Sequence, residues 1–138
     1  IAENALTIEE FLVNELNKGN INKALFTKKP LKIKLHGHCH QKALSSVLPT
    51  MKMLQIPENY SVEEIPGGCC GMAGGFGYEK EHYEISMKIG ALSLLPAIDN
   101  TDADTVISAP GTSCRQQIKD GTDKIAFHPV EVLFDALT

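Results

Sequence analysis

The chain has 138 residues, of which 43% are hydrophobic and 22% charged, and its formal net charge is −4. This length and composition fit one globular domain and exclude an intrinsically disordered chain. The charges are scattered without a basic stripe, so a nucleic-acid partner is not expected. No apolar run is long enough to cross a bilayer and no signal-peptide pattern opens the sequence, so we expect no transmembrane segment.

The first thirty residues read as a helix followed by a linker. Residues 7–10, Thr-Ile-Glu-Glu, form a capping box, and the helical pattern that follows fades at Gly19. The sequence begins with Ile1, and a helix starts only a few residues later. We therefore expect a piece of a longer polypeptide, in which residues 1–30 are a helix and linker from a preceding domain and residues 31–138 form the main domain.

Strand-like segments alternate with helical patterns along the main domain. Pro49 interrupts the helical pattern after the first strand, which predicts a kink or two short helices. A strand–helix alternation is typical of parallel strands joined by crossovers. The sequence therefore predicts an α/β fold with an open, mostly parallel sheet of about four strands flanked by helices. The expected strands cover residues 31–35, 60–66, 104–111 and 124–129. From Glu79 the pattern is helical again, with one apolar face formed by Tyr83, Met87, Ala91 and Leu94.

Each cysteine follows one of the first three predicted strands. Cys39 follows the first strand, Cys69 and Cys70 the second, and Cys114 the third. The carboxyl ends of parallel strands share one edge of the sheet, so the four thiols should lie within reach of one ion or cluster. Four cysteines are too few for a secreted disulfide scaffold, which favours reduced thiols in a cytoplasmic protein. Thiolates near helix N-termini suit a metal or an iron–sulfur cluster.

The adjacent cysteines lie in a glycine-rich stretch, GGCCGMAGGFG, at residues 67–77. Glycines such as Gly71, Gly74 and Gly75 let backbone N–H groups approach sulfur closely. Two neighbouring ligands fit a cluster of several irons more easily than a simple tetrahedral site. Two other interpretations are weaker: buried cysteines acting as small hydrophobic residues, and a phosphate-binding loop, which would need a Lys-Ser or Lys-Thr ending.

Three histidines, His36, His38 and His40, surround Cys39. They could be metal ligands or proton carriers, but hydrogen-bonded histidines at a polar strand end are the more common arrangement. The two remaining histidines, His82 and His128, are expected to be structural.

These motifs resemble the cysteine-rich CCG domain. Its pattern is matched by Cys39, by the triplet at residues 69–71 and by Cys114, with flanking segments HCHQKAL, APGTSC and HPVEVL, so the resemblance covers residues 31–137. Such domains occur in heterodisulfide reductase and in iron–sulfur subunits of glycolate and anaerobic glycerol-3-phosphate dehydrogenases. The sequence looks most like the C-terminal part of long FAD-linked oxidases that also carry iron–sulfur clusters.

The resemblance implies a set of site residues. The metal or cluster ligands would be Cys39, Cys69, Cys70 and Cys114, with Gly71, Gly74 and Gly75 around the cofactor and His36, His38, His40 and Gln117 beside it. Gln117 stands where the family has its last cysteine, so the five thiolates of a noncubane cluster are not all present. The four cysteines that are present could still hold one 4Fe–4S cubane or one zinc ion. Gln117 lies one helical turn after Cys114, so its side chain is expected to point toward the thiols, unless it is a solvated helix residue.

The resemblance also implies a function. The domain would pass electrons in a flavin-linked dehydrogenase of a 2-hydroxy acid such as lactate or glycolate, and no catalytic residue is expected in this chain. FAD would belong to the parent chain or complex, which would also supply ferredoxin-like domains and a quinone or other electron acceptor. The location would be cytoplasmic or peripheral at the inner face of the membrane. The alternative is a zinc-stapled or metal-free docking domain that transfers no electrons.

Overall fold

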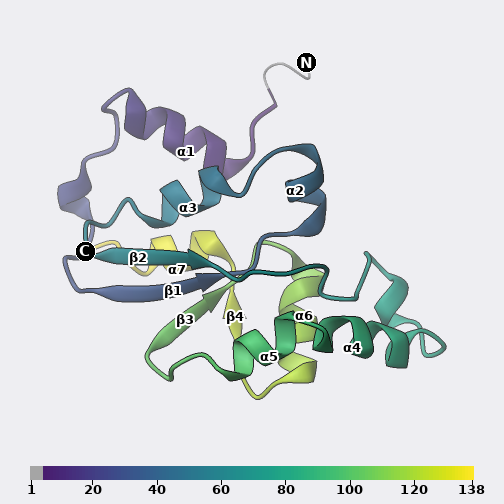
Figure 1. Ribbon diagram of the computed structural model, residues 1–138. Helices are drawn as coiled ribbons and strands as arrows, with labels where there is room; N and C mark the ends of the chain where they lie inside the picture. Colours follow the sequence, from purple (N-terminus) through teal and green to yellow (C-terminus); the bar gives the residue numbers. More distant parts are fainter. Residues whose placement is uncertain (1–4) are drawn as a thin grey trace.

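The computed structural model describes residues 5–138, and a parallel β-sheet runs through the middle of this part of the chain (Figure 1). The sheet has four strands in the order β2-β1-β3-β4, and every neighbouring pair is parallel. This confirms the predicted α/β class. The strands are β1 (Leu31–Leu35), β2 (Tyr60–Glu64), β3 (Thr105–Ser108) and β4 (Ala126–Phe127).

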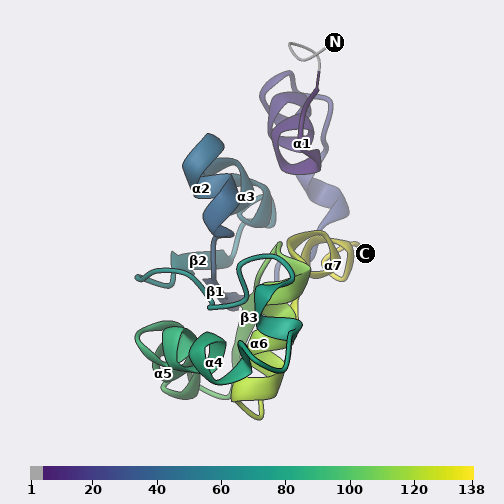
Figure 2. The same ribbon diagram turned by 90° about the vertical axis from the view of Figure 1, so that its right-hand side faces the viewer.

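Helices cover both faces of the sheet (Figures 1 and 2). One core joins side chains of α1, α3 and α7 to Ile33 and Leu35 of β1. A second core joins α5 and α6 to Ile107 of β3 and contains two of the cysteines, Cys70 and Cys114. The helices are α1 (Ile8–Asn17), α2 (Cys39–Leu44), α3 (Leu48–Leu54), α4 (Tyr83–Ala91), α5 (Leu94–Asp99), α6 (Thr112–Gly121) and α7 (Pro129–Phe134), with short 3-10 helices η2 (Lys23–Leu25) and η3 (Phe76–Tyr78).

The predicted capping box at the start of α1 is confirmed. The backbone N–H of Glu10 donates to Oγ1 of Thr7 at 3.3 Å, and the N–H of Thr7 donates to Oε2 of Glu10 at 2.8 Å. Helix α1 buries Val13 in the core that it shares with β1. The division of the chain at residue 30 remains a prediction.

Proline explains where several elements differ from the sequence-based bounds. Strands β2 and β3 end before Pro66 and Pro110, because proline has no N–H to continue the strand ladder. Pro49 lies in the first turn of α3, so α2 and α3 are the two short helices expected there. Pro129 begins α7, which shortens the fourth strand to two residues.

The helical pattern after residue 79 is the clearest departure from the sequence-based expectation. A single apolar face from Tyr83 to Leu94 was expected, but α4 ends at Ala91 and α5 starts at Leu94. Pro96 lies in the first turn of α5, where its missing N–H costs no hydrogen bond. The buried side of α4 is formed by small residues, Ser86 and Gly90, and Tyr83 is exposed.

Candidate metal centre

The strand order brings three loops to one edge of the sheet. Strand β1 lies between β2 and β3, and the chain leaves β1 toward β2 while β3 sits on its other side. Ligands of parallel α/β proteins bind at such a point, where neighbouring loops diverge. His36 directly follows β1, Cys70 lies in the loop after β2, and Cys114 is in the first turn of α6, after β3.

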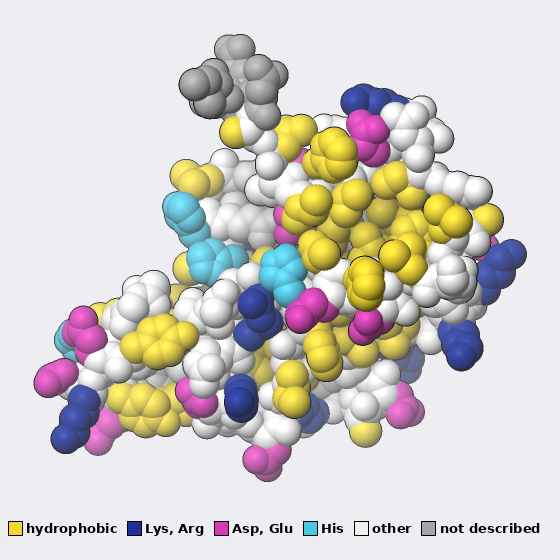
Figure 3. Space-filling view, turned by 180° about the vertical axis from the view of Figure 1, so that it is seen from behind, with side chains coloured by type: hydrophobic (Ala, Val, Ile, Leu, Met, Phe, Trp, Pro, Cys, Tyr) yellow, Lys and Arg dark blue, Asp and Glu magenta, His cyan; other side chains and the backbone are white. Residues whose placement is uncertain are grey.

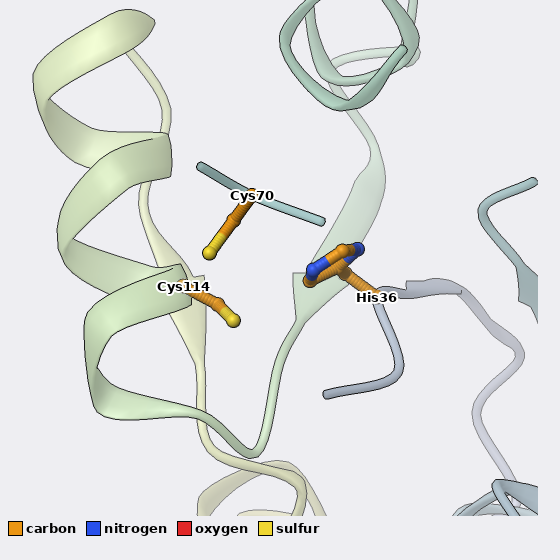
Figure 4. A group of neighbouring side chains, drawn as sticks. All are labelled: His36, Cys70 and Cys114. Atoms are coloured by element: carbon orange, nitrogen blue, oxygen red, sulfur yellow. The ribbon is translucent and has the colours of Figure 1, made fainter. Parts of the chain in front are cut away.

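His36, Cys70 and Cys114 form a compact buried group (Figure 4). Their ligand atoms all lie within 4.8 Å of one another, and the three residues are only 3%, 3% and 1% exposed. The two sulfur atoms lie near each other, with the imidazole of His36 to one side. Two ligands of a tetrahedral ion are about 3.7 Å apart when the metal–sulfur bonds are about 2.3 Å long, so a small side-chain movement suffices to hold an ion.

The pKa values of the two buried thiols are shifted in opposite directions. The neighbouring thiol of Cys114, with help from His36, lowers the pKa of Cys70 well below its usual range despite burial. The proximity of Cys70, together with burial, raises the pKa of Cys114. Cys70 is therefore the thiolate of the pair, which is the form that binds a metal.

Cys69 and Cys39 lie further out. The backbone N–H of Gly71 donates to Sγ of Cys69 at 3.3 Å, which is one N–H···S bond of the kind expected from the glycine-rich loop. Burial raises the pKa of Cys69, and the charges of Cys70 and Cys39 add to this effect. Cys39 is exposed at the start of α2, but its charge also raises the pKa of Cys114. Cys39 and Cys69 therefore lie near enough to influence Cys114, but outside the close group.

The three histidines around Cys39 have different surroundings. His36 belongs to the close group, because its backbone N–H donates to the carbonyl of Ser108 at 2.8 Å and so extends the β1–β3 ladder by one residue. His38 is the N-cap of α2, and the exposed His40 meets its ring edge-on at 6.3 Å between ring centroids. The position of His36, directly after a buried strand, is the sequence signal that could have placed it among the ligands.

Gln117 is buried, at 1% exposure, so the interpretation as a solvated helix residue is wrong. Its amide nitrogen donates to the backbone oxygen of Ser86 at 3.0 Å and to the hydroxyl of Ser86 at 3.1 Å. These bonds direct the amide to α4. Sequence reasoning missed this contact because it joins two helices that are far apart along the chain.

Two glycines allow the backbone to close around the thiols. A Cβ on Gly71, where φ is +98°, would collide with the backbone oxygen of Ser86. A Cβ on Gly111 would lie 2.9 Å from Sγ of Cys114 and would collide with the ring of His38. By contrast, nothing lies within 4 Å of such an atom on Gly74 or Gly75. The close approach that the sequence predicted therefore applies at Gly71.

Similar proteins are dehydrogenases or parts of them. The chain is 34% identical to one subunit of the anaerobic glycerol-3-phosphate dehydrogenase of Escherichia coli K12 over 108 residues, which is 78% of this chain but 27% of that protein. It is 37% identical to D-2-hydroxyglutarate dehydrogenase of Pantoea ananatis over 76 residues, or 55% of this chain and 7% of that protein. The Escherichia coli D-2-hydroxyglutarate dehydrogenase is 36% identical over the same length.

The chain thus spans about a quarter or less of the length of these relatives. No protein-family model and no solved structure matches it. Within residues 5–138, no helix is both long enough and apolar enough to cross a membrane.

Proposed function

We propose that this chain is a redox domain that binds an iron–sulfur cluster and serves a flavin-linked dehydrogenase of a 2-hydroxy acid. The observation that carries the proposal is the close pair of Cys70 and Cys114, from the loops after β2 and β3, with Cys69 and Cys39 near enough for their charges to raise the pKa of Cys114. The relatives support the redox assignment because they are dehydrogenases.

The donor set fits a cluster. Cys39, Cys69, Cys70 and Cys114 would hold a 4Fe–4S cubane, since four thiolates are its ordinary ligands. A bound cluster would supply one-electron storage at this edge of the sheet. The N–H of Gly71 already donates to a sulfur ligand, and such bonds tune the reduction potential of a cluster.

The rest of the proposed activity belongs to a larger assembly. FAD, ferredoxin-like clusters and a quinone or other electron acceptor would lie in other domains of the same polypeptide or complex. The domain would be cytoplasmic, or peripheral at the inner face of the membrane through that complex. The relatives are several times longer than their matched regions, which is consistent with such partner domains.

A second candidate function is a structural zinc site, and the close group His36–Cys70–Cys114 is the observation that favours it. Imidazole and thiolate are the preferred zinc donors. An ion here would link the ends of β1 and β3 to the loop after β2, which stabilises the fold without electron transfer. The site would then need one more ligand from a neighbouring thiol or from water.

Metal analysis after anaerobic purification and reconstitution with iron and sulfide separates the two functions. For the cluster, we expect iron and sulfide in equal amounts, a brown chain, loss of iron in Cys39→Ser and little change in His36→Ala. For zinc, we expect one ion per chain, lost in His36→Ala and kept in Cys39→Ser. Cys114→Ser should empty the site in either case. A wild-type chain that holds neither metal in stoichiometric amount would overturn both functions.

A further inference from the structure

Two of the four cysteines are close enough to react with each other. Sγ of Cys70 and Sγ of Cys114 lie within 4.8 Å of each other, and both thiols are free. The two side chains come from different elements, the loop after β2 and the first turn of α6 (Figure 4). The sulfur atoms of a disulfide are about 2.05 Å apart, so a combined movement of at most about 2.8 Å closes the bond.

The other two cysteines are less well placed for this reaction. Cys69 and Cys39 lie outside the close group, and Cys39 is exposed at the start of α2. The Sγ atom of Cys69 accepts a hydrogen bond from the N–H of Gly71 at 3.3 Å. Adjacent residues have Cα atoms only about 3.8 Å apart, which is shorter than a disulfide normally spans, so a bond from Cys69 to Cys70 would be strained. The geometry therefore favours one pair.

The sulfur of Cys114 lies close to a pocket at the surface. Gly111 and the half-buried His38 line this open pocket, which has a volume of about 420 Å³. A Cβ on Gly111 would lie 2.9 Å from Sγ of Cys114 and would collide with the ring of His38, so this glycine stands between the pocket and the sulfur. Figure 3 shows histidine side chains grouped at the surface on one face of the molecule. A molecule as small as hydrogen peroxide therefore needs only a small opening to reach the pair.

We propose that Cys70 and Cys114 form a redox-active disulfide when a peroxide oxidises the metal-free chain. Hydrogen peroxide first converts one thiol to a sulfenic acid and releases one water. The second sulfur then attacks the sulfenic sulfur, so that the S–S bond forms, the S–O bond breaks and a second water leaves. In total, the two thiols lose two electrons and two protons, and one peroxide is reduced to two waters.

The disulfide would exclude a metal from the close group. Thiolates are the sulfur ligands of metals, and the new bond removes both of them, so the imidazole of His36 is the one donor of this group that remains. Reduction by a thiol restores the two donors. Peroxide would thus control the metal content of the domain. This regulation rests on the proposed function, whereas formation of the disulfide does not.

Oxidation of the reduced, metal-free 138-residue chain with one equivalent of hydrogen peroxide tests the proposal. Mass spectrometry of unreduced peptides should show a Cys70–Cys114 link as the main product in the folded chain, and a mixture of links in denaturant. Cys70→Ser should abolish the link. Cys69→Ser, the matched change at the neighbouring position, should keep it. If a variant does not fold, the peptide map of the unmodified chain still decides.

A titration with zinc ions alone then compares the reduced and oxidised chains. We expect the reduced chain to bind zinc, the oxidised chain to bind none at the close group, and dithiothreitol to restore binding. A different main link, or sulfinic acid without a link, would overturn the disulfide, and zinc binding by the reduced chain would leave the metal function standing. Equal zinc binding by both forms would overturn the regulation. Failure of both forms to bind zinc would count against the metal function and overturn the regulation, while an observed Cys70–Cys114 link would still stand.

Discussion

The side-chain amide of Gln117 donates to the backbone oxygen of Ser86 at 3.0 Å, and both residues are buried. The amide also lies against Gly71 and Gly90, so α6, α4 and the loop that carries Cys69 and Cys70 meet at this point. The glutamine thus supports the backbone beside the thiols through hydrogen bonds to α4.

Gln117→Ala should lower the free energy of unfolding by about 1–3 kcal/mol, because the two buried hydrogen bonds from the amide to Ser86 are lost. Urea denaturation of the metal-free chain measures the effect. The control is Gln116→Ala on the same helix, whose amide donates to the exposed Asp120 at 2.8 Å. That change should cost less than about 0.5 kcal/mol. Equal costs for the two variants would contradict the role of Gln117.

Gly71→Ala should destabilise the chain far more than Gly74→Ala. Both glycines have positive φ, +98° and +70°, so both substitutions carry a similar backbone cost of about 1–2 kcal/mol. Only Gly71 has a backbone oxygen, that of Ser86, in the space that a Cβ would need. We expect a further loss of about 1–3 kcal/mol for Gly71→Ala, measured by urea denaturation. A result in which the two variants are equally stable would show that the loop can move away from α4.

Alkylation by iodoacetamide should distinguish the four thiols. In the folded, metal-free chain Cys39 should react first because it is exposed, and Cys69 more slowly because it is half-buried with a raised pKa. Cys70 and Cys114 should react last because they are buried. Mass spectrometry of peptides gives the four rates, and all four thiols should react in denaturant.

The same alkylation identifies the ligands after metal loading. A cluster held by four cysteines should protect Cys39 as well as the buried pair, whereas zinc at the His36–Cys70–Cys114 group should leave Cys39 reactive. Rapid labelling of Cys70 in the folded chain would contradict its burial.

The stability of α7 should fall in acid because of His128. Nδ1 of His128 accepts a hydrogen bond from the N–H of Val130 at 3.2 Å and so caps the helix. Burial, together with the charge of Arg115, lowers the pKa of His128 below 6.5, so the folded state favours neutral imidazole. This contribution is present above about pH 6.5 and is lost as the pH falls through the folded-state pKa.

His128→Asn should keep the helix cap and remove its pH dependence, since asparagine is a good N-cap and does not titrate. Between about pH 7.5 and about pH 5, the wild type should lose up to about 1 kcal/mol more stability than the variant. Urea denaturation at the two pH values measures the difference. Parallel losses in the two chains would show that protonation of His128 does not weaken the cap.

Local signals in the sequence were sufficient for much of the fold. The capping box of α1 and the strand at residues 31–35 depend only on near neighbours, and both are found in the structure. The sequence did not predict that α4 ends at Ala91, because the helical pattern continues through Leu92. It also did not predict which side of α4 is buried, because that side is set by the packing of Ser86 and Gly90.

The site was predictable to the extent that it follows from strand topology. The rule that parallel strands end at one edge placed Cys70 and Cys114 together. It could not show that His36 joins them, because that depends on one extra backbone bond to Ser108. Nor could it show that Gln117 turns to Ser86, which requires the packing of α6 against α4.

The parallel strand order also affects how the chain can acquire a metal. His36 and Cys114 meet only after β3 has paired with β1, and β2 is added on the opposite side. Such distant pairings carry a large loop-closure entropy and form slowly. The unfolded chain offers two partial donor sets, the histidines around Cys39 and the adjacent Cys69 and Cys70, and neither contains the donors of the folded group, so a metal bound to one of them does not assemble the sheet as it does in a small zinc finger. Assembly of the native metal site from unfolded chains should therefore proceed at the rate of refolding.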